Sequence, residues 1–333
     1  MSMKTTLETL YAHRHLTRQE ASQILVELAG GMYNHAQMAS FLTVYRMRNI
    51  TVDELNGFRE AMLELCISPD FSEFNTIDLC GTGGDGKNTF NISTLASFVA
   101  AGAGLKVAKH GNYSVSSACG SSNVLEYFGY RFSGDSDKLR RELDQANICF
   151  LHAPVFHPAM KNVAPVRKDL GVKTFFNMLG PLVNPGRPGN QLVGVFSPEI
   201  CRLYNYLYQD LDMNYTIVHS LDGYDEVSLT GAARLETMKG SRILHPEHLG
   251  LNRYAPEEIK GGQDIPTSAA LFKDILEGNG TRARNDVVIA NAALAIQVYH
   301  PEKSLEESVE LARESLTSGR ALQVFEQLIE MQP

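Results

Sequence analysis

The chain has few cysteines, and their spacing forms no pair that would bind zinc or define a disulfide framework. The five cysteines are scattered and odd in number, and no C-x-x-C pair occurs: Cys66, Cys80, Cys119, Cys149 and Cys201. A structural zinc site and a disulfide-stapled fold are therefore not indicated. Most of these cysteines lie in apolar runs, which is typical of buried thiols in a reducing compartment.

Long apolar runs and an excess of positive charge are also absent. No apolar stretch is long enough to span a bilayer, and residues 1–7 lack the apolar core of a signal peptide. We therefore expect a cytoplasmic location and no membrane partner. The formal net charge is −8, so nucleic acid is not an expected partner, and local basic residues must hold any anionic ligand.

The 333 residues fall into two regions by pattern. Up to about residue 70 only helices are predicted, and capping boxes at Thr17 with Glu20 and at Thr51 with Glu54 open two of them. From Thr76 onward strands alternate with helices, which predicts an α/β fold with a central, mostly parallel or mixed sheet flanked by helices. We expect a small helical domain, 1–70, completed by an insert at about 162–185, and an α/β domain, 71–333.

Polar clusters follow four of the five strands that apolar runs predict. The strands are expected at 77–80, 105–108, 148–151, 192–196 and 215–219, and a hairpin at 234–238 and 241–244. The polar clusters are 81–94, 109–122, 152–161 and 220–226. Ligands of open parallel sheets bind at the carboxyl ends of the strands, so these clusters predict one shared site.

The first cluster is a glycine-rich turn between a strand and a helix expected at 95–103. Gly81, Gly83 and Gly86 match G-x-G-x-x-G, but a dinucleotide site also needs an acidic residue about 20 positions later. Lys109 and His110 close the next predicted strand instead, so a dinucleotide is not expected. A Walker loop also fails, because its final Ser or Thr is missing. Glycines before a helix start favour phosphate binding, and a structural turn is the alternative.

Three further groups of residues suit an anionic substrate. The hydroxyl-rich loop after Lys109 fits a phosphate or pyrophosphate, with a flexible polar loop as the equal alternative. Asp225 and Glu226 are adjacent carboxylates of the kind that bind Mg²⁺ with substrate phosphates, although adjacent acids are also common on surfaces. Arg167 could hold a planar carboxylate through two hydrogen bonds, or lie on a solvated helix face.

Six motifs in order give the chain a close resemblance to the anthranilate phosphoribosyltransferases over essentially its full length. The motifs are 81–85, 89–94, 109–112, 157–161 with 165–168, 177–185, and 222–226. The resemblance implies an Mg²⁺-dependent pentosyltransferase that forms a homodimer through its helical domains. It would transfer the phosphoribosyl group of 5-phosphoribosyl 1-pyrophosphate to the amino group of anthranilate and release pyrophosphate, the second step of tryptophan biosynthesis from chorismate.

The resemblance also implies site residues. Anthranilate would contact Gly81, Asn112 and Arg167, and two Mg²⁺ ions per subunit would be held with ligands from Ser93, Asp225 and Glu226. No residue is assigned as a general acid or base, and Lys109 with Mg²⁺ would stabilise the leaving group. Phosphoribosyl pyrophosphate would contact Gly81, Gly84, Asp85, Thr89, Asn91, Ile92, Ser93, Thr94, Lys109, His110, Gly111, Asn112, Tyr113, Ser114, Val115, Ser116, Ser117 and Ser121.

The chain departs from the family pattern in one loop. Tyr113 and Ala118 stand where the family commonly has Arg and Lys, so the loop carries two fewer positive charges. We therefore expect it to hold phosphates by backbone N–H and hydroxyl groups more than by charge.

Two alternative functions share the fold: a pyrimidine nucleoside phosphorylase, which uses inorganic phosphate, and a non-catalytic relative that binds nucleic acid.

Overall fold

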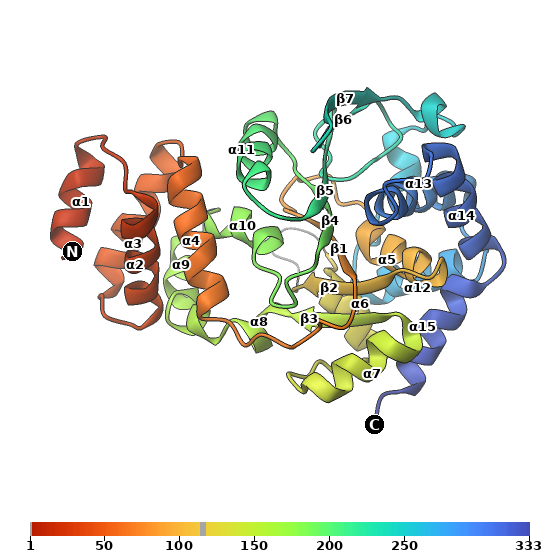
Figure 1. Cartoon of the computed structure of the whole chain (residues 1–333), viewed down its shortest axis with the longest axis horizontal. Coiled ribbons are helices and arrows are strands. Elements are labelled where there is room, and N and C mark those ends of the chain that lie inside the picture. Colours follow the sequence, from red (N-terminus) through yellow and green to blue (C-terminus); the bar gives the residue numbers. More distant parts are fainter. Residues whose placement is uncertain (1, 114–117) are drawn as a thin grey trace. The chain divides into compact units, whose positions relative to one another are not determined.

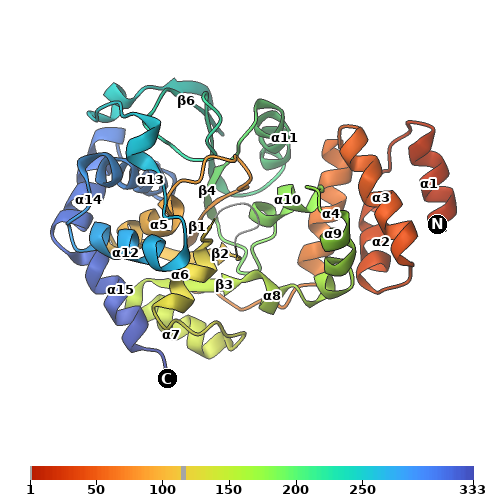
Figure 2. The same ribbon diagram turned by 180° about the vertical axis from the view of Figure 1, so that it is seen from behind.

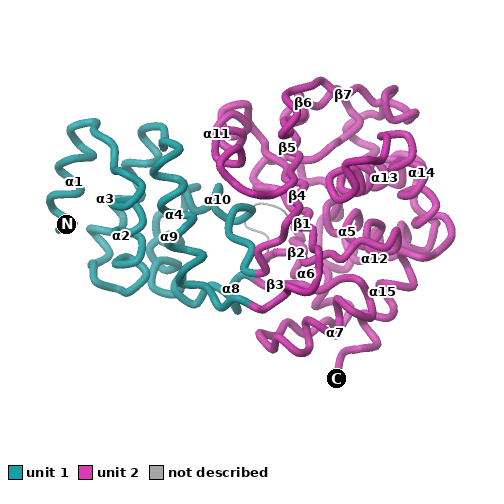
Figure 3. Tube along the Cα trace, viewed as in Figure 1, with its two compact units in different colours: residues 1–68, 153–185 teal, residues 69–152, 186–333 magenta. Residues whose placement is uncertain are grey.

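The computed structural model of the protein describes residues 2–113 and 118–333 and consists of two compact units (Figure 3). The helical unit comprises Met1–Ser68 and Ala153–Pro185, and the α/β unit comprises Pro69–His152 and Gly186–Pro333. The sequence placed the returning segment at about 162–185, but the unit takes up the chain again at Ala153. The change of unit therefore coincides with the end of strand β3 (Ile148–His152), where the sheet hydrogen bonds stop.

The helical unit is built from N-terminal helices and from short helices of the returning segment (Figure 1). Thr17 and Thr51 accept N-cap hydrogen bonds as predicted, and Asn34 does the same at the start of α3. Phe58 stacks on Phe175 with ring centroids 4.4 Å apart, so the returning segment contributes to the aromatic core. The helices are α1 (Met3–Tyr11), α2 (Arg18–Ala29), α3 (His35–Met47), α4 (Val52–Glu64), α8 (Ala153–Phe156), η1 (Pro158–Asn162), α9 (Ala164–Leu170), α10 (Phe176–Leu179) and η2 (Gly180–Leu182).

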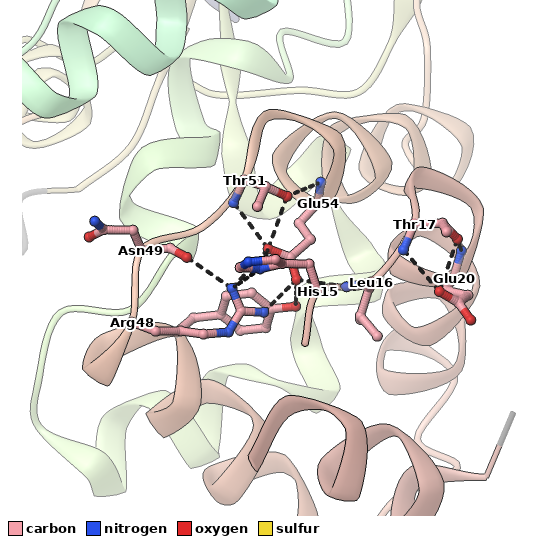
Figure 4. Close-up of polar contacts among 9 residues, drawn as sticks. His15, Leu16, Thr17, Glu20, Arg48, Asn49, Thr51 and Glu54 are labelled. Carbon is pink, nitrogen blue, oxygen red and sulfur yellow. Dashed lines mark hydrogen bonds and ion pairs between the residues drawn. The ribbon is translucent and has the colours of Figure 1, made fainter. Parts of the chain in front are cut away.

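A buried carboxylate ties the helical unit together (Figure 4). Glu54 is 0% exposed and accepts hydrogen bonds from Leu16 N at 3.0 Å, Thr51 N at 3.0 Å and Tyr45 Oη at 3.1 Å. It also forms an ion pair with Arg48. Burial by itself would raise the pKa of Glu54, but the hydrogen bonds and the Arg48 charge outweigh it, and the pKa is lowered.

The α/β unit contains a seven-stranded mixed sheet of order β3-β2-β1-β4-β5-β6-β7. Strands β1 to β5 are parallel, with Leu79 of β1 opposite Leu192 of β4, and β6 and β7 form the predicted antiparallel hairpin. The parallel strands therefore place their carboxyl ends along one edge. The bounds are β1 (Thr76–Gly81), β2 (Lys106–Gly111), β3 (Ile148–His152), β4 (Asn190–Gly194), β5 (Asn214–Ser220), β6 (Ala233–Thr237) and β7 (Gly240–Leu244).

Helices cover both faces of this sheet, as expected. The two opposite views show α5 and α13 on one face and α11 on the other (Figures 1 and 2). Helix α13 is buried on almost every side, which fits its run of small and apolar residues. The helices are α5 (Ile92–Gly102), α6 (Ser121–Tyr127), α7 (Ser136–Ala146), α11 (Pro198–Gln209), η3 (Pro246–Leu249), η4 (Pro256–Ile259), α12 (Ile265–Leu276), α13 (Arg282–Tyr299), α14 (Leu305–Thr317) and α15 (Arg320–Glu330).

Two predicted boundaries near the site were wrong. Helix α5 begins at Ile92 and not at Leu95, because the Ser93 N–H finds a tertiary acceptor and Ile92 packs in the core. Strand β2 continues to Gly111, three residues past its predicted end, since residues 107–111 all pair with β3. In the described part of the chain, no helix is long and apolar enough to cross a membrane.

Candidate active site

The glycine-rich turn after β1 packs directly against the acidic segment that follows β5. The Gly83 N–H donates to Asp225 Oδ2 at 2.7 Å. A Cβ atom on Gly81 would lie 2.4 Å from the same oxygen, so any other residue there would displace the carboxylate. The two polar clusters, more than 140 residues apart in sequence, therefore meet at one place because β1 and β5 both end there.

The start of helix α5 faces the second acid. The Ser93 N–H donates to Glu226 Oε1 at 2.8 Å. Because the first N–H groups of a helix have no partner within the helix, this carboxylate satisfies one of them and lies at the positive end of the helix dipole. Ser93 is thus a helix residue whose backbone and side chain both face the acidic segment, and not part of a preceding loop.

Lys109 lies inside the sheet, and not in a loop after it. Its side chain is 2% exposed, and Nζ donates to the carbonyl oxygen of Leu79 and lies 3.4 Å from Ser93 Oγ. Burial lowers the pKa of Lys109, while the charges of Asp78 and Glu226 oppose that shift. The lysine therefore brings a fixed positive charge beside Ser93, from the neighbouring strand.

The surroundings of Asp225 and Glu226 disfavour the ionised form of both carboxyl groups. Burial raises the pKa of Asp225 to about 7, and the nearby charge of Asp85 adds to the shift. Burial and the charge of Asp225 raise the pKa of Glu226 well above its usual range, while Ser93 N and Lys109 oppose it. The Oδ2 atom of Asp85 is buried and has no hydrogen-bond donor among the described residues. Negative charge therefore outweighs positive charge in this pocket.

The residues present fit a divalent cation that shares its coordination with a ligand. Ser93, Asp225 and Glu226 line one small cavity, and two carboxylates with a hydroxyl are hard oxygen donors of the kind Mg²⁺ prefers. Within residues 2–113 and 118–333, no group of three or more His, Cys, Asp and Glu side chains forms a metal cluster. Mg²⁺ often completes such a sparse protein set with water and substrate phosphate oxygens.

Hydrogen bonds connect the residues after the glycine turn to two other segments of the α/β unit. Asn91 Nδ2 donates to the Cys119 carbonyl at 3.0 Å, and the Asn88 carbonyl accepts from Gly261 N at 2.8 Å. Ser121 Oγ donates to the Asn112 carbonyl at 3.3 Å. Ser114, Val115, Ser116 and Ser117, which were predicted to contact phosphoribosyl pyrophosphate, lie outside the described residues.

Comparison with known proteins identifies the family. Residues 73–322 match the glycosyl transferase family, a/b domain, and residues 4–66 match the glycosyl transferase family, helical bundle domain. The anthranilate phosphoribosyltransferase of Flavobacterium johnsoniae is 58% identical over 329 residues, with 99% of each chain covered. That of Flavobacterium psychrophilum is 60% identical over 326 residues, with 98% of each chain covered. The chain belongs to the anthranilate phosphoribosyltransferase family.

Solved structures of anthranilate phosphoribosyltransferases share the fold. The crystal structure of the Thermus thermophilus protein has a TM-score of 0.92 at 35% identity and covers 98% of both chains. The Saccharomyces cerevisiae protein in complex with PRPP and Mg has a TM-score of 0.91 at 26% identity, covering 99% of this chain and 97% of that one. The resemblance drawn from the six motifs, the expected fold and the enzyme class, a glycosyltransferase, are therefore confirmed.

Arg167, the predicted carboxylate-binding residue of this transferase, belongs to the helical unit. It lies in α9, half-buried, with its guanidinium 5.2 Å from the centre of the Phe176 ring. Burial lowers its pKa, and no acidic side chain among the described residues pairs with it. A desolvated arginine without a carboxylate partner is a suitable anchor for an anionic ligand.

Several residues that shape the site were not predicted from the sequence. Gly194, at the end of β4, leaves room for the Asp225 backbone. Ser220 and Asn291 hydrogen-bond the backbone around Glu226. A local pattern could have indicated Ser220, because it ends β5 within a predicted cluster, but Gly194 and Asn291 lie in apolar runs that carry no site signal.

Proposed function

We propose that the chain transfers the phosphoribosyl group of 5-phosphoribosyl 1-pyrophosphate to the amino group of anthranilate, with release of pyrophosphate. The observation that carries this proposal is that the glycine turn and the α5 N-terminus each donate a backbone hydrogen bond to one acid of the Asp225–Glu226 pair. A phosphate loop facing two acids with excess negative charge suits a pyrophosphate bound together with Mg²⁺.

The phosphoribosyl pyrophosphate site would draw on the residues at the ends of β1 and β2. Gly81 ends β1, Gly84, Asp85, Thr89 and Asn91 come from the segment that follows it, and Ile92, Ser93 and Thr94 supply the first turn of α5. His110, Gly111, Asn112, Tyr113 and Ser121 come from the end of β2 and the start of α6. Backbone N–H groups in a glycine-rich turn and at a helix start favour phosphate oxygens without requiring many side-chain cations.

Ser93, Asp225 and Glu226 would hold Mg²⁺, with two ions per subunit as our proposal. When bound, Mg²⁺ would neutralise negative charge on the departing pyrophosphate. Lys109 would keep Ser93 in place and add a buried positive charge on the same side. Burial raises the pKa of both acids, so a bound cation would stabilise their ionised forms more than it would those of exposed carboxylates. This favours a metal-binding role for the pair over the alternative that they are surface acids without a role.

Anthranilate would be held by Asn112, Gly81 and Arg167. The half-buried Arg167, which pairs with no acidic side chain among residues 2–113 and 118–333, supports an acceptor that carries a carboxylate. The amino group of an aromatic amine is already unprotonated at neutral pH, so no general base is required. Bond breaking at ribose C1 leaves positive charge on the sugar and negative charge on pyrophosphate, so the rate would depend on positioning and on stabilising the leaving group.

We also propose a homodimer formed through the helical unit. That unit exposes large apolar side chains, among them Met32 at 70% and Met47 at 83%, which a second copy would cover. The cytoplasmic location and the absence of a nucleic-acid partner stay predictions. The five free thiols and the net charge of −8 fit them.

The test is the loss of anthranilate fluorescence when purified protein is mixed with phosphoribosyl pyrophosphate, with and without Mg²⁺. We expect turnover with Mg²⁺ and little without it, and a loss of more than about 100-fold in the Asp225→Asn, Glu226→Gln double variant. Absence of turnover with metal present would refute the proposal. A parallel assay of uridine and thymidine phosphorolysis without Mg²⁺ would reveal a nucleoside phosphorylase instead.

A further inference from the structure

The peptide unit between Glu226 and Val227 is held from both sides by side chains. Its carbonyl oxygen, on Glu226, accepts a hydrogen bond from Ser220 Oγ at 2.6 Å. Its N–H, on Val227, donates to Asn291 Oδ1 at 3.0 Å. Because these two groups belong to one planar unit, the two bonds together fix the orientation of the plane that follows the acid pair.

Asn291 makes a complete set of hydrogen bonds in doing so. Its Nδ2 donates to the Val227 carbonyl at 2.9 Å and to the Val287 carbonyl, one turn earlier in α13, at 2.8 Å. Two carbonyl acceptors and one N–H donor are compatible with only one orientation of the amide. The side chain is 4% exposed and lines the same cavity as Ser93 and Glu226.

The acid pair needs such external support. In an extended strand adjacent side chains point to opposite sides, whereas Asp225 and Glu226 line one cavity, so the backbone here departs from a regular strand. The segment also lies between β5 and β6, where no neighbouring strand pairs with it. Two carboxylates that repel each other would move apart unless the backbone that carries them is fixed.

We infer that Asn291 is a positioning residue that sets metal affinity by clamping the Glu226–Val227 peptide from helix α13. All three hydrogen bonds of its amide go to backbone groups, so we assign it no role as a metal ligand. It fixes the backbone that carries the two carboxylates before a cation binds, which removes the cost of ordering that segment at the moment of binding. The inference rests on the metal site of the proposed function.

The variant Asn291→Leu keeps a buried side chain of similar size and removes all three hydrogen bonds. A matched control exists at the amino end of β4, the end of the strand away from the acids. Asn190, 1% exposed, donates from Nδ2 to Asn75 Oδ1 at 2.7 Å and to Thr76 O at 3.1 Å, and its Oδ1 accepts from Asn214 at 2.9 Å. Asn190→Leu therefore removes the same number of side-chain hydrogen bonds, one of them buried and two part-buried, far along the strands from the acids.

Electron paramagnetic resonance of the free Mn²⁺ ion measures how tightly the full chain binds Mn²⁺ in the absence of substrates. The melting temperature of each variant is measured in parallel. We expect both leucine variants to melt earlier. We expect Asn291→Leu to bind Mn²⁺ at least about tenfold more weakly than the unmodified protein, and Asn190→Leu to differ less than about twofold. Equal Mn²⁺ affinity in Asn291→Leu, or an equal loss in Asn190→Leu, would overturn the inference.

Two further variants keep the test decisive. Ser220→Ala removes the other half of the clamp with little change in volume, so it replaces Asn291→Leu if that variant does not fold, and it should also weaken Mn²⁺ binding. Unchanged binding in Ser220→Ala would then contradict the clamp. Asp225→Asn tests the metal site separately from the clamp. If this variant leaves Mn²⁺ binding intact, the metal assignment of the proposed function fails, and with it this inference.

Discussion

Gly194 lies against the backbone of Asp225 so closely that a Cβ atom on Gly194 would stand 1.4 Å from the Asp225 carbonyl oxygen. No side-chain movement can relieve that overlap, because both groups belong to the backbone. Gly194→Ala must therefore push the acid pair out of the cavity. The carboxyl end of β4 thus fixes the position of residues that follow β5.

We expect Gly194→Ala to raise the Mg²⁺ concentration for half-maximal activity by more than about tenfold and to lower the melting temperature. Gly189, just before β4, is the control, because a Cβ there would meet its nearest atom at 3.7 Å, an ordinary contact. Gly189→Ala should change neither quantity appreciably. An unaltered Mg²⁺ requirement in Gly194→Ala would show that the acids do not bind the metal in the observed place.

Metal affinity should rise with pH. Burial raises the pKa of Asp225 to about 7, burial and the charge of Asp225 raise the pKa of Glu226 well above its usual range, and only ionised carboxylates bind Mg²⁺. Below pH 7 each unit of acidification should weaken Mg²⁺ binding by at least about tenfold, because a proton must leave. Calorimetric titrations in two buffers of different ionisation enthalpy measure the proton release. A pH-independent affinity between 6 and 8 would be inconsistent with these shifts.

The same shifts predict how stability without metal depends on pH. Carboxyl groups whose pKa is raised by folding stabilise the protein fully below their ordinary pKa, about 4, and that contribution is lost as pH rises through the raised value. Added Mg²⁺ should therefore increase the melting temperature more at pH 8 than at pH 6. In Asp225→Asn this difference should shrink.

Tyr113 is expected to matter little for substrate affinity. Its hydroxyl donates to Glu126 at 2.6 Å, and its ring lies edge-on to His152 at 4.7 Å, so its polar group already has a partner. Tyr113→Phe should change the KM for phosphoribosyl pyrophosphate by less than about fivefold, since one partly exposed hydrogen bond contributes about 1 kcal/mol. Tyr113→Ala should also have a modest effect. A hundredfold increase in either variant would mean that the side chain contacts the substrate directly.

The helical unit should depend on the Arg48–Glu54 pair. Arg48→Ala leaves a buried carboxylate without its cation, which costs about 3–5 kcal/mol in comparable cases. The control is Arg18→Ala, which breaks an ion pair with Glu60 whose side chains are 44% and 40% exposed and should cost less than about 1 kcal/mol. Urea unfolding measures both free energies. Equal losses of unfolding free energy in the two variants would mean that other groups stabilise the buried Glu54 carboxylate when Arg48 is absent.

Acid should remove the contribution of Glu54. Its pKa is lowered in the folded state, so the stabilisation is present above the ordinary glutamate pKa, about 4.3, and is lost as pH falls through the lower folded value. The unfolding free energy of Glu54→Gln should therefore fall less steeply than that of the unmodified protein between pH 5 and pH 3. A parallel decline would contradict the lowered pKa.

The sequence alone was sufficient for the element order, the mixed sheet and the family. Helix N-caps such as Thr17 and Thr51 are local signals, and apolar runs separated by polar clusters mark parallel strands that end at one edge. The six motifs predict a set of ligand-binding residues because each motif is short and contiguous. Boundaries were less certain: β2 runs on to Gly111 because β3 pairs with it.

Contacts between distant segments were decided only by the tertiary structure. Lys109 looks like a loop cation in the sequence, but pairing with β3 extends β2 and places its charge in the sheet beside Ser93. Asn291 looks like one polar residue in an apolar helix, but packing of α13 on the sheet brings its amide to the Val227 backbone. Short-range patterns follow from backbone geometry. The position of a side chain over a peptide 64 residues away depends on how the sheet and its covering helices pack.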